Sequence, residues 1–211
     1  MPDRSMDLRT LSLAYDRSAG GYDERFRALQ REKYRAAAAL LVPWLHGQRP
    51  GLAAGARVLD AGAGTGLFAE WLRSDQEQHP RLRALLRAPL EAGRLCALDA
   101  SLAMVRQAGA RGALPLVADL ALPPLRPGAF ALVLSFTAVL DRVPQALAAL
   151  GALVATGGAL CVSFLTRESP AATEVAAAAG LGYLAEERAG QDRLFLLVRG
   201  AAPAAGSEGT R

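Results

Sequence analysis

Apolar residues gather in short runs along this chain, and longer amphipathic segments separate the runs. Short apolar runs predict buried strands, whereas apolar positions that recur every three to four residues predict helices. The alternation of the two predicts an α/β fold: a doubly wound, seven-stranded, mostly parallel sheet with helices on both faces. We expect strands at residues 58–60, 94–99, 114–120, 129–136, 159–165, 183–188 and 193–199, and helices at 24–46, from 67, and at 101–107, 143–154 and 171–179.

The two ends of the chain depart from this alternation. Residues 1–46 are expected to form an N-terminal helical cap, and the last two strands a hairpin antiparallel to the rest of the sheet. An Arg-rich segment, 73–93, lies between the first two strands and is expected to be an inserted short helix between prolines. Residues 1–200 are read as one domain, followed by a small polar tail, 201–211, that is expected to be disordered.

A turn dense in glycine follows the first strand: Val58-Leu59-Asp60-Ala61-Gly62-Ala63-Gly64-Thr65-Gly66. Glycine adopts positive φ and lets a ligand approach the backbone without meeting a Cβ. The free N–H groups at the start of the next helix also favour a ligand there. The spacing differs from the dinucleotide fingerprint G-x-G-x-x-G, because Leu67 stands where that fingerprint has its last glycine. A nucleotide-type ligand is therefore indicated, and an NAD-dependent oxidoreductase ranks last.

Three of the predicted strands end in an aspartate, namely Asp60, Asp99 and Asp119. The carboxyl ends of parallel strands meet at one edge of a sheet, and open α/β sheets bind their ligands at that edge. A carboxylate there can accept hydrogen bonds from ribose hydroxyls. Ser101, just after the second of these acids, is expected to cap the following helix.

Two motifs resemble those of a known family, the class I (Rossmann-like) S-adenosylmethionine-dependent methyltransferases. They are D-x-G-x-G-x-G at residues 60–66 and D-x-S-x-x-M at residues 99–104, and the resemblance extends over about residues 12–199. It implies S-adenosyl-L-methionine as the cofactor. It also implies that the first motif surrounds the methionyl part of the cofactor, here with Asp60, Ala61, Gly62 and Gly64.

The same resemblance assigns the nucleoside part of the cofactor to the next two strands. Asp99 would accept hydrogen bonds from the ribose, and Ala100 and Met104 would pack near the adenine. Asp119 would accept a hydrogen bond from the adenine amine, and the backbone N–H of Leu120 would meet the ring.

The segment Tyr15-Asp-x-x-Ala-x-x-Tyr22-Asp resembles the N-terminal cap of many small-molecule methyltransferases, which closes over the cofactor. Tyr15 or Tyr22 would then face the sulfonium, an electron-rich ring beside a cation. The alternative is that both rings pack the helix onto the sheet. Lys33 is expected either to be solvated or to approach the cofactor carboxylate.

The sequence indicates fewer candidate residues for methyl transfer than for cofactor binding. Ser135 leaves the fourth strand where the methyl group would be presented, and Asp141 is the candidate general base by position, with a helix N-cap as its alternative role. Ala131 stands where relatives usually carry an aspartate. The absence of N-P-P-Y and D-P-P-Y motifs argues against adenine-N6 and glutamine methylation. No Cys and His residues have metal-ligand spacing, so a metal site is not expected.

Composition limits the class of protein and its expected compartment but does not indicate a function. The 211 residues are 52% hydrophobic and 21% charged, with a net charge of +4, which is too mild an excess to indicate nucleic-acid binding. The two cysteines, Cys96 and Cys161, are expected to be buried free thiols. Without a membrane-spanning run or a signal peptide, the expected compartment is the cytoplasm.

These observations predict a methyltransferase that transfers a methyl group to an O, N or C atom of a small-molecule acceptor. Two alternatives remain open: a protein or RNA acceptor, and a non-catalytic scaffold that keeps the fold. The intact acids and glycines argue against the scaffold. The acceptor and the oligomeric state are left undetermined by the sequence.

Overall fold

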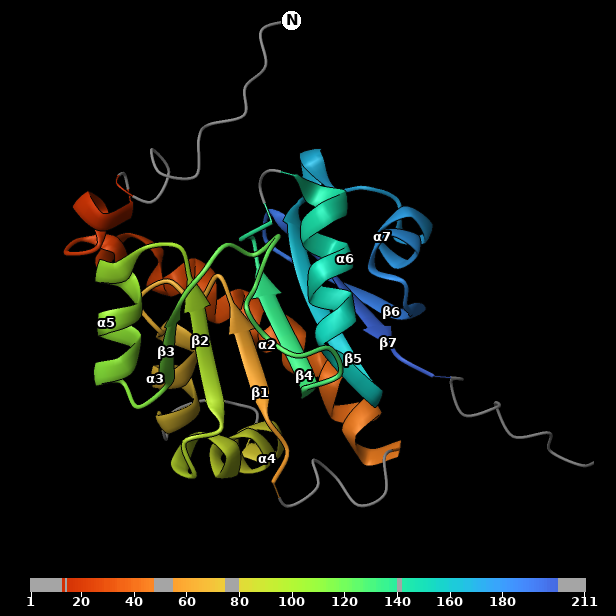
Figure 1. The fold of residues 1–211 in the computed structure, drawn as a ribbon, viewed down its shortest axis with the longest axis horizontal. Helices are drawn as coiled ribbons and strands as arrows, with labels where there is room; N and C mark the ends of the chain where they lie inside the picture. The colour runs from red at the N-terminus through yellow and green to blue at the C-terminus, as the bar shows by residue number, and fades with distance from the viewer. Residues whose placement is uncertain (1–12, 14, 48–54, 75–79, 140–141, 201–211) are drawn as a thin grey trace, which may run out of the picture.

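The computed structural model describes residues 13, 15–47, 55–74, 80–139 and 142–200, with 81 and 83–85 described by their backbone alone. Seven strands form one sheet in the order β3-β2-β1-β4-β5-β7-β6 (Figure 1). The strands are β1 Val58–Ala61, β2 Leu95–Asp99, β3 Leu114–Val117, β4 Phe130–Phe136, β5 Val154–Leu165, β6 Gly182–Ala189 and β7 Asp192–Val198.

The pairing of the strands confirms the predicted topology. The four neighbouring pairs from β3 to β5 are parallel, while β7 runs antiparallel to both β5 and β6. The chain runs outward from β1 to β2 and β3, then returns to place β4 on the other side of β1. Such a reversal of strand order opens a crevice at the carboxyl ends of the two strands, here β1 and β4.

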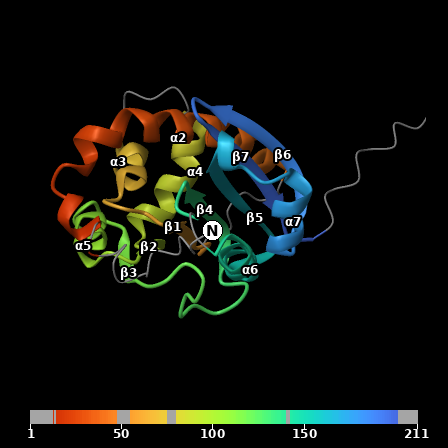
Figure 2. The same ribbon diagram turned by 90° about the horizontal axis from the view of Figure 1, so that it is seen from above.

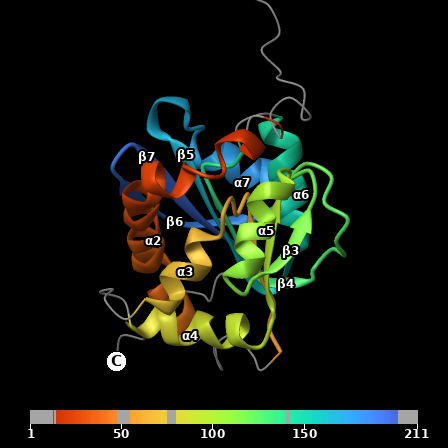
Figure 3. The ribbon, with the colours of Figure 1, turned by 90° about the vertical axis from the view of Figure 1, so that its left-hand side faces the viewer.

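Helices cover both faces of the sheet, as predicted (Figures 2 and 3). One hydrophobic core joins the sheet to the long N-terminal helix and the three helices that follow, and a second core joins it to the last two. The first group comprises α2 Tyr22–Gly47, α3 Leu67–Arg73, α4 Pro80–Glu91 and α5 Leu102–Ala110, and the second α6 Val143–Leu153 and α7 Ala172–Ala179.

The segment between β1 and β2 contains the predicted inserted helix, α4, but Pro89 does not interrupt it. A proline removes one backbone donor and tends to break a helix interior. Here it lies in the last turn, where Leu86 and Leu90 on either side are buried against the core. Their burial maintains the helix to Glu91, with Arg87 paired to Glu91 on its exposed side.

Strand β5 begins at Val154, five residues earlier than expected, because the strand includes the glycine-rich residues 156–158 as a bulge. Phe130 pairs with Val154 and Leu132 with Ala159, so extra residues of β5 lie opposite Ala131. The backbone of Gly158 passes so close to this strand that a Cβ on it would stand 2.7 Å from the Ala131 carbonyl oxygen. Only glycine fits this approach.

Two further expectations from the sequence concern the cysteines and membrane-spanning segments. Cys96 and Cys161 are buried free thiols, as predicted. Within the described part of the chain, no helix combines the length and the apolar character needed to cross a membrane. The predicted tail, 201–211, and the first twelve residues of the predicted cap lie outside the described residues.

Candidate functional site

The glycine turn joins β1 to α3 at the crevice between β1 and β4. Its three glycines, Gly62, Gly64 and Gly66, all have positive φ, at 78°, 53° and 83°. The Gly62 N–H donates a hydrogen bond to the Leu98 carbonyl at 2.7 Å, which ties the turn to β2. A Cβ on Gly62 would lie 2.0 Å from the Ala138 Cβ, so the segment after β4 closes against the turn.

The three predicted acids meet at one edge of the sheet. Asp60 lies in β1 and Asp99 ends β2, while Asp119 follows β3 by two residues. These three strands are neighbours and parallel. The sequence therefore predicted the shared edge correctly, although the three carboxyl groups differ in their surroundings.

Asp99 organises the glycine turn as well as its own strand. Its Oδ2 accepts a hydrogen bond from the Gly64 N–H at 3.0 Å, and its Oδ1 accepts one from the Ser101 N–H at 2.9 Å. Burial raises the pKa of this carboxyl group, and the backbone donors partly offset the rise. Asp99 therefore links the two loops to which the sequence assigns the cofactor.

Asp60 is the most buried of the three acids, with 4% of its surface exposed. Burial, together with the nearby charge of Asp99, raises its pKa to about 7. No hydrogen-bond donor among the described residues counters that rise. A buried carboxyl group without a donor is poised to receive a cationic or hydrogen-bonding partner, because only such a partner makes its ionised form favourable.

Asp119 has two partners. Its Oδ1 accepts a hydrogen bond from the Ala121 N–H at 2.9 Å, and its Oδ2 lies 2.6 Å from Arg142 Nη2. Arg142 comes from the segment that leads into α6, so this pair bridges the β3 and β4 connections. An adenine amine would have to share the carboxylate with the guanidinium.

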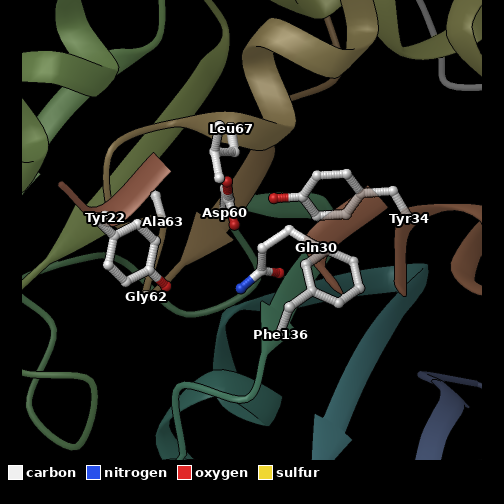
Figure 4. A pocket seen from close by; sticks show the side chains of 8 residues that line it. All are labelled: Tyr22, Gln30, Tyr34, Asp60, Gly62, Ala63, Leu67 and Phe136. Atoms are coloured by element: carbon white, nitrogen blue, oxygen red, sulfur yellow. The ribbon is translucent and has the colours of Figure 1, made fainter. Parts of the chain in front are cut away.

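A pocket lies beside the glycine turn, between β1, β4 and the long helix α2 (Figure 4). The Tyr34 hydroxyl points toward the Asp60 carboxylate, and the Gln30 amide nitrogen points toward the Tyr22 hydroxyl. Tyr22 and Phe136 add two further aromatic rings. The remaining lining residues are Gly62, Ala63 and Leu67.

Helix α2 contributes three polar groups to the pocket: the hydroxyls of Tyr22 and Tyr34 and the side-chain amide of Gln30. Burial raises the pKa of Tyr22 to about 12 and raises that of Tyr34 well above its usual value, so both hydroxyls stay protonated at neutral pH. Gln30 is hydrogen-bonded to the Tyr22 hydroxyl, yet its Oε1 is buried without a partner among the described residues. An unsatisfied buried oxygen is costly and points to a missing ligand donor.

Two acids of the cap hold it to the site, a role that the sequence reasoning missed. Asp16 Oδ1 accepts hydrogen bonds from the Ser101 hydroxyl at 2.5 Å and from the Ala103 N–H at 3.1 Å. Asp23 Oδ1 accepts one from the Thr65 hydroxyl at 2.5 Å, and its Oδ2 pairs with Arg111. The Tyr-Asp pair repeated after seven residues was the available signal, although a turn at residues 19–21 separates the two copies.

The two tyrosines of this repeat lie near the predicted site. Tyr15 is close enough to Asp99 for the carboxylate to raise its pKa, although burial is the larger cause. The Tyr22 ring lies 3.7 Å from the position of a Cβ on Gly64. Tyr15 therefore lies near the end of β2 and Tyr22 beside the glycine turn, and Tyr22 also packs against the first hydrophobic core.

The other predicted cofactor residues divide between the site and the core. Leu120 lies beside the turn, with its Cδ1 3.8 Å from a Cβ placed on Gly62. Ser101 caps α5 and accepts a hydrogen bond from the Met104 N–H, as predicted, and the Met104 side chain is buried. Ala61 is buried in the second core, and Ala100 donates its N–H to Asp99.

Ser135 and Asp141 were assigned to the transfer step. Because successive strand residues face opposite sides, Ser135 lies on the sheet face opposite Phe136 and the pocket. Its buried Oγ has no hydrogen-bond partner within the described ranges. Asp141 lies outside the described residues.

The expectation that Lys33 is solvated is wrong. The side chain is buried, with 7% of the residue exposed, and its Nζ pairs with Asp192 Oδ2 at 3.1 Å instead of meeting solvent. The partner lies at the start of β7, far along the chain, where no local pattern could indicate it.

We expect Gly62→Ala to destabilise the fold by about 1–3 kcal/mol, because the new Cβ would overlap Ala138 at a φ that alanine avoids. Chemical denaturation measures the change. Gly21→Ala is the matched control, since nothing lies within 4 Å of a Cβ there, and it should change stability by less than about 0.5 kcal/mol. Equal effects from both variants would show that Gly62 is not confined by Ala138.

In the parts of the chain that the structure describes, no group of three or more His, Cys, Asp or Glu side chains could hold a metal ion. The described chemistry at the crevice therefore consists of carboxylates, an amide, phenols and backbone N–H groups. These groups suit an organic ligand that carries both hydrogen-bond donors and a positive charge.

Comparisons with known proteins give likeness in structure only. No protein-family model matches the sequence, and no curated protein matches it. A candidate methyltransferase of Haloferax volcanii, solved in complex with the Trm112 methyltransferase activator, superposes with a TM-score of 0.62 at 17% identity, over 87% of this chain and 96% of that one.

Two further structures match over nearly their whole length. One, from Methanococcus maripaludis, is a candidate S-adenosyl-L-methionine-dependent methyltransferase, with a TM-score of 0.58, 14% identity, and 97% and 99% of the two chains covered. The other, from Thermotoga maritima, is described as a possible histamine N-methyltransferase, with a TM-score of 0.56, 16% identity, and 90% and 99% covered. The chain therefore has the fold of the class I S-adenosylmethionine-dependent methyltransferases.

Proposed function

We propose that this protein is an S-adenosyl-L-methionine-dependent methyltransferase whose acceptor is a small molecule with an O, N or C nucleophile. The observation that carries the proposal is the pocket between β1 and β4. It combines a glycine turn, a buried carboxyl group without a hydrogen-bond donor, and aromatic rings. The fold adds to the proposal, but a fold alone does not determine a reaction.

The residues around the pocket fit the amino-acid end of the cofactor. Asp60 can accept from its ammonium group, and such a contact would offset the burial of the carboxylate. Gln30 Oε1, which is buried without a partner, offers a second acceptor. The Tyr22 and Tyr34 rings present electron-rich faces or hydroxyls to the same space, which favours a cation.

The nucleoside end would extend along the edge of the sheet toward β2 and β3. Asp99 is placed to accept from ribose hydroxyls while it holds Gly64, and Asp119 is placed to accept from the base while it holds Arg142. In this assignment the three acids bind three parts of one ligand. Tyr15, beside Asp99, would cover the ribose from the cap.

When bound, the cofactor supplies an electrophilic methyl group on its sulfonium. The task of the protein is then to hold an acceptor in line with that methyl group and to keep water out. Tyr22 and Tyr34 stay protonated at neutral pH, so they can orient an acceptor by donating hydrogen bonds but cannot act as its base. This arrangement favours catalysis by positioning, and Asp141 remains the proposed base on its sequence position alone.

The cap favours a small acceptor. Helix α2 contributes Tyr22, Gln30 and Tyr34 to the pocket wall, and Asp16 and Asp23 hold the cap to the cofactor loops. An acceptor must therefore fit under or beside this cover. The Thermotoga maritima protein, described as a possible histamine N-methyltransferase, offers a parallel for an acceptor of that size.

A protein or RNA acceptor is the second candidate, and one feature favours it. Only the short helix Thr166–Glu168 and a few residues connect β5 to α7, and this link is too short to form a large lid over that side of the crevice. The Haloferax volcanii protein, solved with the Trm112 activator, is a parallel for a methyltransferase that works with a protein partner. Methylation of tRNA or protein fractions with a labelled cofactor would support this alternative.

Calorimetric titration with S-adenosyl-L-methionine, S-adenosylhomocysteine and NADH tests the proposal. We expect micromolar binding of the two adenosyl ligands and none of NADH, because the third glycine of the dinucleotide fingerprint is replaced by Leu67. Binding of NADH alone would contradict the cofactor assignment. Binding of the adenosyl ligands would justify a screen of acceptors, with small amines and phenols before RNA and protein. Absence of all binding would favour the scaffold alternative.

A further inference from the structure

A buried polar cluster lies one strand away from the pocket, at the carboxyl ends of β4 and β5. Lys33 Nζ donates a hydrogen bond to Thr137 Oγ1 at 2.6 Å and pairs with Asp192 Oδ2 at 3.1 Å. Thr137 Oγ1 donates to Asp192 Oδ1 at 2.5 Å and lies 3.1 Å from Ser163 Oγ. The four residues come from α2, the end of β4, β5 and β7, and the Lys33 and Asp192 side chains are at most 8% exposed.

Such a cluster is poorly explained by stability alone. Taking both charges of an ion pair out of water costs free energy that their attraction often only repays, and apolar residues of similar volume serve equally well. Buried pairs are better attested as devices that select one geometry. Lys33 is also the only lysine in a chain whose other basic residues are arginines.

The geometry that the cluster selects is that of Thr137. Its φ is +52°, a value that β-branched residues rarely adopt and that persists only where surrounding contacts impose it. The Thr137 N–H is held by Ser163 Oγ at 2.9 Å, and Lys33 and Asp192 hold its hydroxyl. Backbone and side chain are thus fixed from three elements.

The turn fixed in this way forms one wall of the proposed cofactor site. Phe136, immediately before Thr137, lines the pocket, and Ala138, immediately after it, meets the glycine turn at Gly62. If Thr137 relaxed to a negative φ, the chain direction between these two neighbours would change. Phe136 and Ala138 could not then both keep their positions.

We propose that Lys33 and Asp192 are positioning residues: they hold Thr137 in its left-handed conformation and thereby set the wall formed by Phe136 and Ala138. This inference rests on the proposed function, because it takes the pocket as the place of the cofactor methionyl group and of the incoming acceptor. Neither residue lines the pocket. Their effect on binding passes through the backbone of the turn.

The main test compares the wild type with the double variant Lys33→Met/Asp192→Asn, which removes both charges and leaves no lone buried ion. We expect its affinity for S-adenosylhomocysteine to fall about tenfold, since the turn loses its restraint. Glu32→Met, an exposed neighbour on the same helix, is the control and should bind as the wild type does. Unchanged affinity in a folded double variant would overturn the proposal.

A third substitution distinguishes a positioning role of Lys33 and Asp192 from a role in stability alone. Adding Thr137→Gly to the double variant should recover part of the affinity, because glycine adopts a φ near +52° without support. A role in stability alone predicts no recovery, and that result would also overturn the proposal. If the double variant does not fold, Thr137→Val serves instead: it removes the hydroxyl while the ion pair stays, and wild-type affinity would count against the inference.

Hydrogen exchange at the Thr137 amide gives a readout that needs no ligand. The amide should exchange faster in the double variant than in the wild type or Glu32→Met, because its bond to Ser163 depends on the conformation that the cluster imposes. Equal exchange in all three would refute the positioning role. Failure of the wild type to bind any adenosyl ligand would instead refute the proposed function, and the exchange result would stand separately.

Discussion

Asp99→Ala is expected to weaken the binding of S-adenosylhomocysteine by about 1–3 kcal/mol, or roughly fivefold to more than a hundredfold. Two losses combine in this variant. The proposed acceptor for the ribose hydroxyls disappears, and so does the carboxylate oxygen that holds the Gly64 N–H at 3.0 Å. The glycine turn would then be less well ordered before any ligand arrives, so the variant should also lose some thermal stability.

Asp99→Asn separates the two losses. Its single side-chain oxygen can keep one of the backbone bonds while the negative charge is removed. We expect an affinity between those of the wild type and Asp99→Ala, with thermal stability near that of the wild type. Titration calorimetry together with thermal unfolding measures both effects. An alanine variant that binds as tightly as the wild type would remove Asp99 from the cofactor site.

The frame of the fold could be predicted because it depends on local signals. The apolar runs of β1, β2 and β4 are short and bounded by turns, and each is followed by an amphipathic segment. That alternation leaves few arrangements besides a parallel sheet with helices on both faces. The position of the three acids at one edge follows from it, since each lies at or near the carboxyl end of its strand.

The contacts between distant segments could not be predicted in the same way. Lys33 and Asp192 pair only because α2 crosses the sheet near the start of β7. Asp16 and Asp23 reach α5 and the glycine turn because the cap folds back over the carboxyl edge. Each of these polar residues has an ordinary local setting, and its partner is chosen by tertiary packing.

The degree of burial of the strand-end acids also could not be predicted from the sequence. Asp60 and Asp119 both stand at the carboxyl end of a predicted strand, yet Arg142 and a backbone N–H satisfy Asp119, whereas the buried Asp60 faces the Tyr34 hydroxyl in the pocket. The depth of the pocket depends on side chains from α2 that a strand-end motif does not contain. The structure therefore distinguishes the two acids by their burial and by the partners that satisfy them.

That difference predicts that the affinity for S-adenosyl-L-methionine depends on pH through Asp60. The pKa of its carboxyl group in the free protein is about 7, so the group is largely neutral below that pH. A cofactor ammonium binds the ionised form, and affinity should fall by up to about tenfold for each pH unit below about 7. Calorimetric titrations from about pH 5 to about pH 7.5 measure the slope.

Asp60→Asn is the control for this slope, because it keeps the size of the side chain and removes the titration. It should bind more weakly than the wild type at pH 7.5 and show a shallower pH dependence, with any remaining slope assigned to other groups such as Asp99, whose pKa is also raised. A wild-type affinity that stays constant across the range would show that the ligand does not require an ionised Asp60.

The ligand-free protein should show the opposite trend in stability. A carboxyl group whose pKa is raised on folding stabilises the folded state below its unfolded pKa of about 3.8, and this contribution is lost as the pH rises through about 7. The unfolding temperature of the free protein should therefore carry a decreasing contribution from Asp60 over that window, and Asp60→Asn should lack it. Adding the cofactor at pH 7.5 should reverse the loss, since its ammonium group supplies the positive charge that the buried carboxylate otherwise lacks.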